Sequence, residues 1–503
     1  MNSGKVILVG AGPGDAGLLT LRGAEAIGAA EVVVYDRLVS DEILDMLPRG
    51  AERIFVGKQS GNHAVPQDEI NKILLKNALD GKLIVRLKGG DPFLFGRGGE
   101  ELELLQQNGI AFEVVPGVTS AFAAPAYAGI PVTHRDFCSS VHVITGHARA
   151  GGELSIDFPA LVKADGTLVF LMGVATMGEI TGGLIAAGMA ADMPAAIIEN
   201  GTRPNQRVTL GTVSGIYALA RDRGVKSPAL LVVGRVCSLG ERFDWFGNLP
   251  LKGRRIAVTR PRDRAGTLTN RLRALGAEVI AYPCIETEHI ERNVPAETAL
   301  RDIARYKWLA LTSPSGVSSL CELLGGLNAD ARLLAPVKIA AVGSATSDAL
   351  AEIGLRADFV PEKYSAAALA RGLTERVPPA GRVLIFRAEE GAGDLTEILT
   401  DAKILYDDIA VYRTKYISEK SAAMAAALRG NELDLVCFTS ASTVRGFAES
   451  LAAEGVSEKE FSQLTAACIG SATEAAARGR GFKTITAKNA SIDELINVIL
   501  EGK

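Results

Sequence analysis

The second half of the chain contains an internal repeat, and this repeat restricts the fold more than any other feature. Three motifs occur twice: RIAVTR from Arg255 returns as RVLIFR from Arg382, TSPSGV returns as TSASTV, and GSAT returns as a second GSAT. The two members of each pair stand 127 residues apart. Because three separate motifs share one offset, we interpret this half as two copies of one α/β unit that face each other across a cleft.

Short β-branched segments alternate with stretches rich in alanine and leucine along almost the whole chain. The segments KVILVG, EVVVYD, KLIVRL, TLVFLM and ALLVVG predict strands, and LLTLRGAEAIGAA predicts a helix. This alternation is typical of α/β architecture. It breaks in GERFDWFGNLPLKG, which mixes glycine, proline, tryptophan and charge, so we expect the main domain boundary at residues 247–253.

Length and composition exclude several classes of protein. A chain of 503 residues is too long for one core. The formal net charge of −4 argues against a nucleic-acid binder, and no apolar run reaches the ~18 residues of a membrane span. The start, MNSGKVILVGAG, lacks the layout of a signal peptide. Six scattered cysteines without a CxxC pair favour a cytoplasmic protein, and the five histidines form no metal-binding pattern.

Glycine-rich or hydroxyl-bearing loops follow several predicted strands of the first half. VGAGPGD fits a dinucleotide loop poorly, because GxGxxG needs glycine where the chain has Asp15, and Pro13 stiffens the turn. A plain structural turn is the other alternative for this motif. RLKGGDPFLFGRGGEE can offer backbone N–H and C=O groups to a polar ligand. VPGVTSA, FLMG and ENGT end three further strands, where ligands of open α/β folds gather.

The first half resembles the uroporphyrinogen-III C-methyltransferases in nine motifs that occur in the family's order. They are VGAGPGD, VVVYDRLVS, VGK, RLKGGDPFLFGRGGEE, VPGVTSA, AYAGIPVTHRD, ITGH, ENGT and SPALLVVG, over about residues 4–245. The most specific part is RLKGGDPF followed by GRGGEE. The resemblance implies a homodimer with a tetrapyrrole-methylase fold, in which S-adenosylmethionine lies between two α/β lobes and becomes S-adenosylhomocysteine. The implied reaction methylates uroporphyrinogen III at C2 and C7 to give precorrin-2.

The resemblance also implies roles for individual residues. Asp36 and Lys58 stand where the family has its general base and general acid, although a helix cap and a solvated turn are the alternatives for these two residues. No metal is expected, because the sulfonium methyl group is already activated. The implied S-adenosylmethionine contacts are Pro13, Gly89, Gly90, Asp91, Leu94, Thr119, Ser120, Met172 and Gly201. For the many carboxylates of the substrate, the candidate partners are Arg37, Arg97, Arg135 and Arg149.

The repeated motifs of the second half place small hydroxyl residues at strand-to-helix turns. Such a turn can bind an anion, and it can equally be an ordinary N-cap. Four of these turns in two copies favour carboxylate binding. In the order VTRP, TSPSGV, VGSAT, VYRT, FTSAST and IGSAT, about residues 253–500 resemble uroporphyrinogen-III synthase. The resemblance implies a two-domain α/β fold, with residues 287–414 in one domain and residues 253–286 plus 415–503 in the other.

The synthase family closes hydroxymethylbilane to uroporphyrinogen III with inversion of the last pyrrole, which is a lyase reaction. The resemblance assigns Tyr412 to the loss of the bilane hydroxyl, with a strand aromatic in the core as the alternative. It assigns substrate contacts to Ser313, Thr346, Ser440 and Thr473.

Together the two resemblances predict a cytoplasmic bifunctional enzyme of tetrapyrrole synthesis, with residues 1–247 as methyltransferase and residues 253–503 as synthase. Its partners would be small-molecule tetrapyrroles, without nucleic acid or membrane, and the pathway could end in cobalamin, sirohaem or haem d1. The alternative is a methylase of another corrin precursor fused to a duplicated small-molecule binding module, such as a solute clamp.

Overall fold

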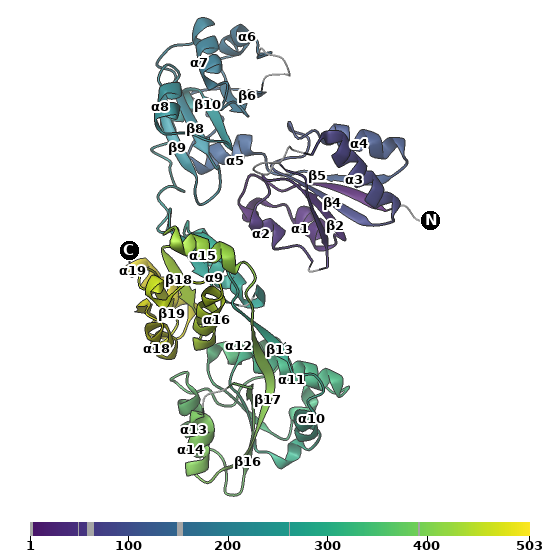
Figure 1. Ribbon diagram of the computed structural model, residues 1–503, viewed down its shortest axis with the longest axis vertical. Coiled ribbons are helices and arrows are strands. Elements are labelled where there is room, and N and C mark those ends of the chain that lie inside the picture. Colours follow the sequence, from purple (N-terminus) through teal and green to yellow (C-terminus); the bar gives the residue numbers. More distant parts are fainter. Residues whose placement is uncertain are drawn as a thin grey trace. The chain divides into compact units, whose positions relative to one another are not determined.

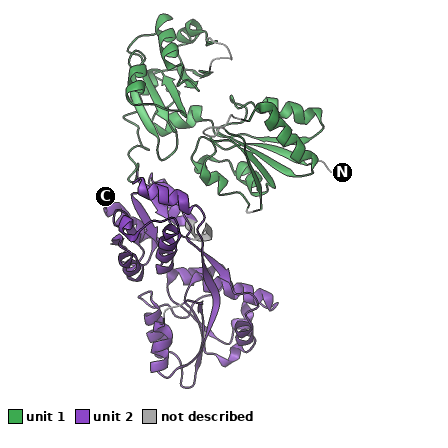
Figure 2. Ribbon diagram, viewed as in Figure 1, with its two compact units in different colours: residues 1–253 green, residues 254–503 purple. Residues whose placement is uncertain are grey.

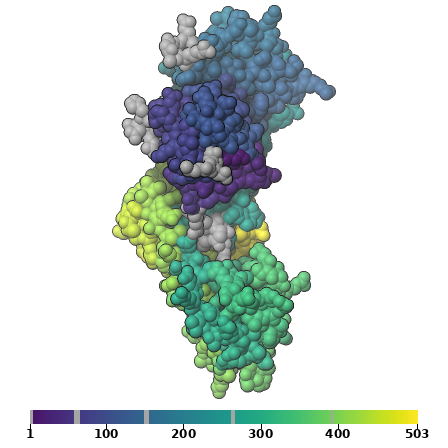
Figure 3. Space-filling model, turned by 90° about the vertical axis from the view of Figure 1, so that its right-hand side faces the viewer, coloured from purple at the N-terminus to yellow at the C-terminus, as the bar shows by residue number. Residues whose placement is uncertain are grey.

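The structure is a computed structural model that describes residues 4–48, 50–57, 65–147, 154–260, 262–390 and 393–502. The chain divides into two compact units, residues 1–253 and residues 254–503 (Figure 2). Figure 3 shows the space-filling surface, coloured along the sequence from the first residue to the last. Within the described ranges, no helix combines the length and the apolar character that a membrane crossing requires.

The first sheet of unit 1 has five parallel strands in the order β3-β2-β4-β1-β5 (Figure 1). Apart from Arg86 and Lys88 on β4, its central strands are apolar on both faces, as expected for a parallel sheet that helices cover on both sides. The strands are β1 (Lys5–Gly10), β2 (Val32–Tyr35), β3 (Glu52–Phe55), β4 (Leu83–Lys88) and β5 (Ala111–Val115). The helices are η1 (Ala16–Leu18), α1 (Leu21–Gly28), α2 (Asp41–Leu44), α3 (Gln67–Leu79) and α4 (Gly98–Gln107).

The second sheet of unit 1 is mixed, with the order β6-β7-β10-β8-β9. Strand β10 is antiparallel to both β7 and β8. Strands β7 and β8 therefore run in the same direction, and their carboxyl ends lie at the same edge of the sheet. The strands are β6 (Val141–Thr145), β7 (Thr167–Leu171), β8 (Pro194–Glu199), β9 (Arg207–Thr212) and β10 (Ala229–Val233). The helices are α5 (Ser120–Tyr127), α6 (Phe158–Lys163), α7 (Met177–Ala186), α8 (Ile216–Asp222) and η2 (Arg235–Leu239).

Unit 2 contains two further five-stranded sheets, β12-β11-β18-β19-β20 and β13-β17-β16-β14-β15. All pairs are parallel except β13 with β17. The first sheet comprises β11 (Arg255–Val258), β12 (Glu278–Ala281), β18 (Leu435–Phe438), β19 (Thr465–Cys468) and β20 (Lys483–Thr486). The second comprises β13 (Ile285–His289), β14 (Trp308–Leu311), β15 (Lys338–Ala341), β16 (Arg382–Ala388) and β17 (Leu405–Tyr416).

The helices of unit 2 follow the strands in the alternation that the sequence predicts. In chain order they are α9 (Arg262–Ala274), α10 (Val294–Arg301), η3 (Ile303–Arg305), α11 (Pro314–Gly326), η4 (Ala331–Leu334), α12 (Ser344–Glu352), α13 (Ala366–Thr374), α14 (Asp394–Asp401), α15 (Ser421–Arg429), α16 (Ala441–Ala452), α17 (Glu458–Phe461), α18 (Ser471–Gly479) and α19 (Ile492–Glu501). The core beside the first sheet is aromatic: Phe447 packs edge-on or tilted against Tyr282, Phe438, Phe461 and Phe482.

The sequence repeat appears in both sheets of unit 2, but each sheet combines strands from both copies. Strands β11, β18 and β19 are neighbours in one sheet, and their repeat partners β16, β14 and β15 are neighbours in the same order in the other. The first copy thus supplies β11 to one sheet and β14 and β15 to the other. The mixed fold of four α/β sheets agrees with the predicted α/β class, and the repeated unit in sequence is not one lobe in space.

Candidate functional site

Three loops meet at the carboxyl edge of the first sheet, and glycines allow their backbones to approach closely. Gly12 and Gly90 exchange two backbone hydrogen bonds of 3.2 and 2.7 Å. A Cβ atom on Gly117 would lie 2.2 Å from the carbonyl oxygen of Gly90 and 2.7 Å from the Cα atom of Gly10. Gly90 has a φ of +68°, which favours glycine. The loops after β1, β4 and β5 therefore form one continuous backbone surface.

Asp91 holds two of these loops together. One carboxylate oxygen accepts hydrogen bonds from the backbone N–H groups of Phe93 and Leu94 at 2.8 and 3.2 Å. The other oxygen accepts one from the backbone N–H of Gly117 at 3.1 Å. Because an ionised carboxylate has about four acceptor positions, Asp91 keeps capacity for one further donor, such as a ligand hydroxyl.

The remaining predicted cofactor contacts lie on both sheets of unit 1. Thr119 is the N-cap of α5 and accepts a hydrogen bond from Ala121, and Ser120 is the first residue of that helix. Met172 follows β7 with a φ of +57° and a half-exposed side chain. Gly201 follows β8, where a Cβ atom would lie 2.3 Å from the Cβ atom of Ala124 in α5.

Hydrogen bonds join the loop after β8 to the loops of the first sheet. The backbone N–H of Asp15 donates to the Thr202 hydroxyl at 3.1 Å, and the Tyr127 hydroxyl donates to the Asp15 carboxylate at 2.7 Å. Burial and the hydrogen bond with Asp15 raise the pKa of Tyr127, so this hydroxyl stays protonated. Arg203 donates to the carbonyl of Leu38 at 2.8 Å. These contacts bring the strand ends of both sheets to one region.

Asp36 begins the loop after β2 and is held from two sides. One of its oxygens accepts a hydrogen bond from the backbone N–H of Leu38 at 2.9 Å. The other lies 3.8 Å from Nη1 of Arg86. The N-cap position of α2 belongs to Ser40, so the helix-cap alternative for Asp36 is wrong.

A buried ionic cluster next to Asp36 escaped the sequence analysis. Glu101 of α4 is fully buried, and its Oε1 accepts from Gln67 at 3.2 Å, from Nε of Arg86 at 3.2 Å and from Nζ of Lys88 at 2.8 Å. Burial, together with the charge of Arg86, lowers the pKa of Lys88. The available signal was LIVRLK, in which two cations stand two residues apart, and so on one face, of an otherwise apolar strand.

The three candidate substrate arginines that the structure describes, Arg37, Arg97 and Arg135, are all exposed. Arg97 pairs with Glu100 through Nε at 2.9 Å, and its φ is +58°. Arg149 and the predicted acid Lys58 lie outside the described residues. Arg203, which the sequence analysis did not select, is half-buried at the same loops, and this burial lowers its pKa.

In unit 2, the structure brings Ser313 and Tyr412 together. Their hydroxyls lie 2.8 Å apart, although the residues are 99 positions apart in sequence. Ser313 is the N-cap of α11 and accepts from the backbone N–H of Gly316 at 3.0 Å. Tyr412 is 9% exposed and packs in the core of its lobe. The ring of Tyr412 is therefore a core aromatic, as the alternative interpretation expected. Its hydroxyl nevertheless lies beside Ser313, a predicted substrate contact.

The other three predicted contacts of unit 2 stand at equivalent helix starts. Ser440 is the N-cap of α16, where it accepts from the backbone N–H of Thr443 at 3.2 Å. Thr346 and Thr473 are the third residues of α12 and α18, and both side chains are buried. In both GSAT turns the N-cap is the glycine, not the serine or threonine. The role of these residues in binding the substrate stays a prediction.

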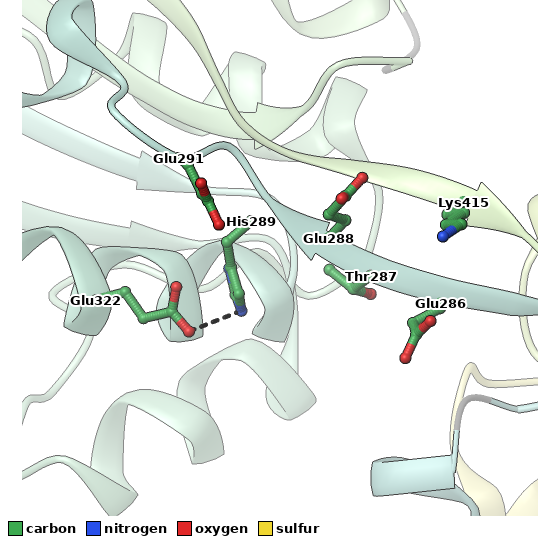
Figure 4. A pocket seen from close by; sticks show the side chains of 7 residues that line it. All are labelled: Glu286, Thr287, Glu288, His289, Glu291, Glu322 and Lys415. Atoms are coloured by element: carbon green, nitrogen blue, oxygen red, sulfur yellow. Dashed lines mark ion pairs between the residues drawn. The ribbon is translucent and has the colours of Figure 1, made fainter. Parts of the chain in front are cut away.

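A pocket of about 320 Å³ lies beside β13, and its charge is mainly negative (Figure 4). His289 lies 3.1 Å from Glu322 and 2.7 Å from the Ser319 hydroxyl. The pocket is lined by Glu286, Thr287, Glu288, His289, Glu291, Glu322 and Lys415. Four carboxylates against one lysine would repel a polycarboxylate, so this pocket is a poor site for the acid side chains of the bilane.

Comparisons with known proteins decide the family. Residues 5–217 match the family model "Tetrapyrrole (Corrin/Porphyrin) Methylases", and residues 266–497 match "Uroporphyrinogen-III synthase HemD". Porphyrin biosynthesis protein HemD of Ruminiclostridium josui is 51% identical over 501 residues, which cover 100% of this chain and 98% of that protein. The chain belongs to the family of porphyrin biosynthesis proteins that join a methylase to a uroporphyrinogen-III synthase. The resemblance stated from the motifs is therefore confirmed.

Other relatives match the methylase half. Siroheme synthase 2 of Klebsiella pneumoniae is 57% identical over 245 residues, which cover 49% of this chain and 53% of that protein. The chain thus spans about half the length of the siroheme synthases that it matches. The crystal structure of uroporphyrin-III C-methyl transferase from Thermus thermophilus with S-adenyl homocysteine is 37% identical, covers 47% of this chain and 100% of that chain, and has a TM-score of 0.41.

Proposed function

We propose that this methylase–synthase makes uroporphyrinogen III and then methylates it. Residues 253–503 close hydroxymethylbilane with inversion of the last pyrrole, and residues 1–247 transfer methyl groups from S-adenosylmethionine to C2 and C7, giving precorrin-2. The synthase comprises one lobe of residues 287–414 and one of residues 253–286 plus 415–503. The observation that carries the proposal is the match of the whole chain to a porphyrin biosynthesis protein, with a methylase model on its first half and a uroporphyrinogen-III synthase model on its second.

The glycine-lined loops of unit 1 fit S-adenosylmethionine, because Gly10 and Gly117, where a Cβ atom would collide with neighbouring backbone, let the loops pack closely and present backbone groups to a polar ligand. When bound, this cofactor supplies a methyl group that is already activated. Backbone groups around Gly90, the free acceptor position of Asp91 and the Thr119 turn would hold its polar parts. Asp36 would accept the proton that the methylated pyrrole loses, and the arginines would hold substrate carboxylates.

In unit 2, the paired hydroxyls of Ser313 and Tyr412 would act where the bilane loses its hydroxyl group. The Tyr412 O–H would donate to the departing oxygen, and Ser313 would hold Tyr412 in this orientation. The serine and threonine turns of both lobes would bind carboxylates and fold the linear chain for closure.

We further propose a cytoplasmic homodimer that uses neither a metal nor nucleic acid. The six free thiols support a reducing compartment. The activated sulfonium methyl supports metal-free transfer, and the net charge of −4 supports a small-molecule rather than a polyanionic partner.

The test is to incubate the full chain with hydroxymethylbilane, with and without S-adenosylmethionine, and to separate the products by isomer and mass. Without the cofactor, uroporphyrinogen III should form; with it, a product that has gained two methyl groups in place of two protons, and so is heavier by two CH₂ units, should replace it. Formation of isomer I alone, which the free bilane gives unaided, would contradict the synthase assignment. A different number of added methyl groups would contradict the methyltransferase assignment.

A further inference from the structure

The buried cluster of Arg86, Lys88 and Glu101 next to Asp36 holds the Arg86 guanidinium in a fixed position. Arg86 donates to Glu101 through Nε at 3.2 Å and to the carbonyl of Leu87 through Nη1 at 2.8 Å. The same Nη1 lies 3.8 Å from Asp36. The Arg86 side chain is only 4% exposed, and that of Glu101 is fully buried. Nη1 also donates to the carbonyl of Val34 on β2 at 3.4 Å. The guanidinium is therefore fixed by groups on β4, α4 and β2, with Nη1 at ion-pair distance from Asp36.

The sheet register explains why Arg86 can reach this carboxylate. Strand β2 is parallel to β4, with Val34 opposite Arg86 and Tyr35 opposite Leu87. Asp36 follows directly, so it leaves β2 beside the end of β4. Its second oxygen is already held by the backbone N–H of Leu38. With Arg86 on one side and Leu38 on the other, the carboxylate has little freedom to rotate.

Removing one charge from this cluster would strongly destabilise the fold, because another buried charge would lose its partner. Arg86 and Lys88 are both cations in a buried position, and Glu101 is the carboxylate that contacts both of them. A buried charge without its partner is strongly unfavourable. The chain therefore keeps three charged groups together below the surface, beside the partly exposed carboxylate of the proposed base.

We propose that Arg86 and Glu101 form a positioning pair for methyl transfer, in which Glu101 fixes Arg86 and Arg86 orients the carboxylate of Asp36. This inference rests on the proposed methyltransferase function. The pair does not touch the transferred methyl group and acts only through Asp36. Lys88 completes the charge balance on the side of the Gly89–Gly90 loop.

The diagnostic experiment places Arg86→Lys in two backgrounds of the full chain. Lysine keeps the positive charge but lacks the fork that reaches Glu101, the carbonyl and Asp36 together. In the otherwise unchanged chain, kcat for methylation should fall roughly 10- to 100-fold, since a misplacement of about 1 Å costs on the order of 10²-fold. The Kd of S-adenosylmethionine, measured by calorimetry, should stay within about twofold. Arg53→Lys, at an exposed position of the same sheet, is the matched control and should leave both quantities unchanged.

In an Asp36→Asn background, Arg86→Lys should cause no further fall in kcat, because its only route of action is already lost. An additive fall, or full activity of Arg86→Lys alone, would overturn the proposal. If Arg86→Lys does not fold, Glu101→Gln is tested in the same two backgrounds, with Glu103→Gln on the exposed side of α4 as its control. Absence of methylation in the unsubstituted chain would instead refute the proposed function, and full activity of Asp36→Asn would refute the role of Asp36.

Discussion

The close approach of three backbones at the proposed cofactor site makes Gly117→Ala a sharp test of that site. A Cβ atom there would lie 2.2 Å from the carbonyl oxygen of Gly90 and 2.7 Å from the Cα atom of Gly10. Normal contact needs roughly 1 Å more, so the loops after β1, β4 and β5 must separate by about that distance. We expect a displacement of this size to weaken binding on the order of 10²-fold, which corresponds to ~2.7 kcal/mol of binding free energy.

We therefore expect Gly117→Ala to weaken S-adenosylmethionine binding by roughly 10- to 100-fold in calorimetry. Synthesis of uroporphyrinogen III should be unchanged, because the substitution lies in unit 1. Gly182→Ala in α7 is the control, since its Cβ atom would meet open space and alanine favours a helix. A Kd for Gly117→Ala within twofold of the unsubstituted chain would refute the placement of the cofactor on these loops.

Three other substitutions test the remaining parts of the structure. Tyr412→Phe removes the hydroxyl paired with Ser313, so formation of uroporphyrinogen III should slow. The free energy of unfolding should fall by only ~0.5–1.5 kcal/mol, because a single hydrogen bond is lost. An unchanged rate would show that Tyr412 serves only to pack the core. Phe447→Ala empties the centre of the aromatic core and should destabilise unit 2 by ~3–5 kcal/mol in denaturant titration, whereas a loss below about 1 kcal/mol would contradict that packing. Burial lowers the pKa of Lys252 from 10.5 to about 8, so between these values the unfolded chain binds more protons and this residue's contribution to stability rises with pH. Lys252→Met should consequently raise the thermal midpoint more at pH 7 than at pH 10, and an equal gain at both would argue against the shift.

The sequence alone specified the local chemistry of this protein. Glycine, proline and hydroxyl residues at strand ends, read in order, were sufficient to predict the α/β class and the two-family composition. The constant offset of 127 residues revealed the duplication of the second half. Each of these features involves residues that are close together in the chain. A short segment is therefore enough to recognise it, whatever the segment contacts in the folded protein.

Tertiary structure decided which of these segments meet. The exchange of strands between the two copies in unit 2 depends on sheet order, which the repeat does not encode. The pairing of Ser313 with Tyr412 joins residues 99 positions apart and requires β17 to pack against α11. The cations of LIVRLK were visible in the sequence, but only the packing of β4 against α4 and β2 decided that Arg86 would meet Glu101 and Asp36. Burial and long-range contact are properties of the packed sheets, and no short segment contains them.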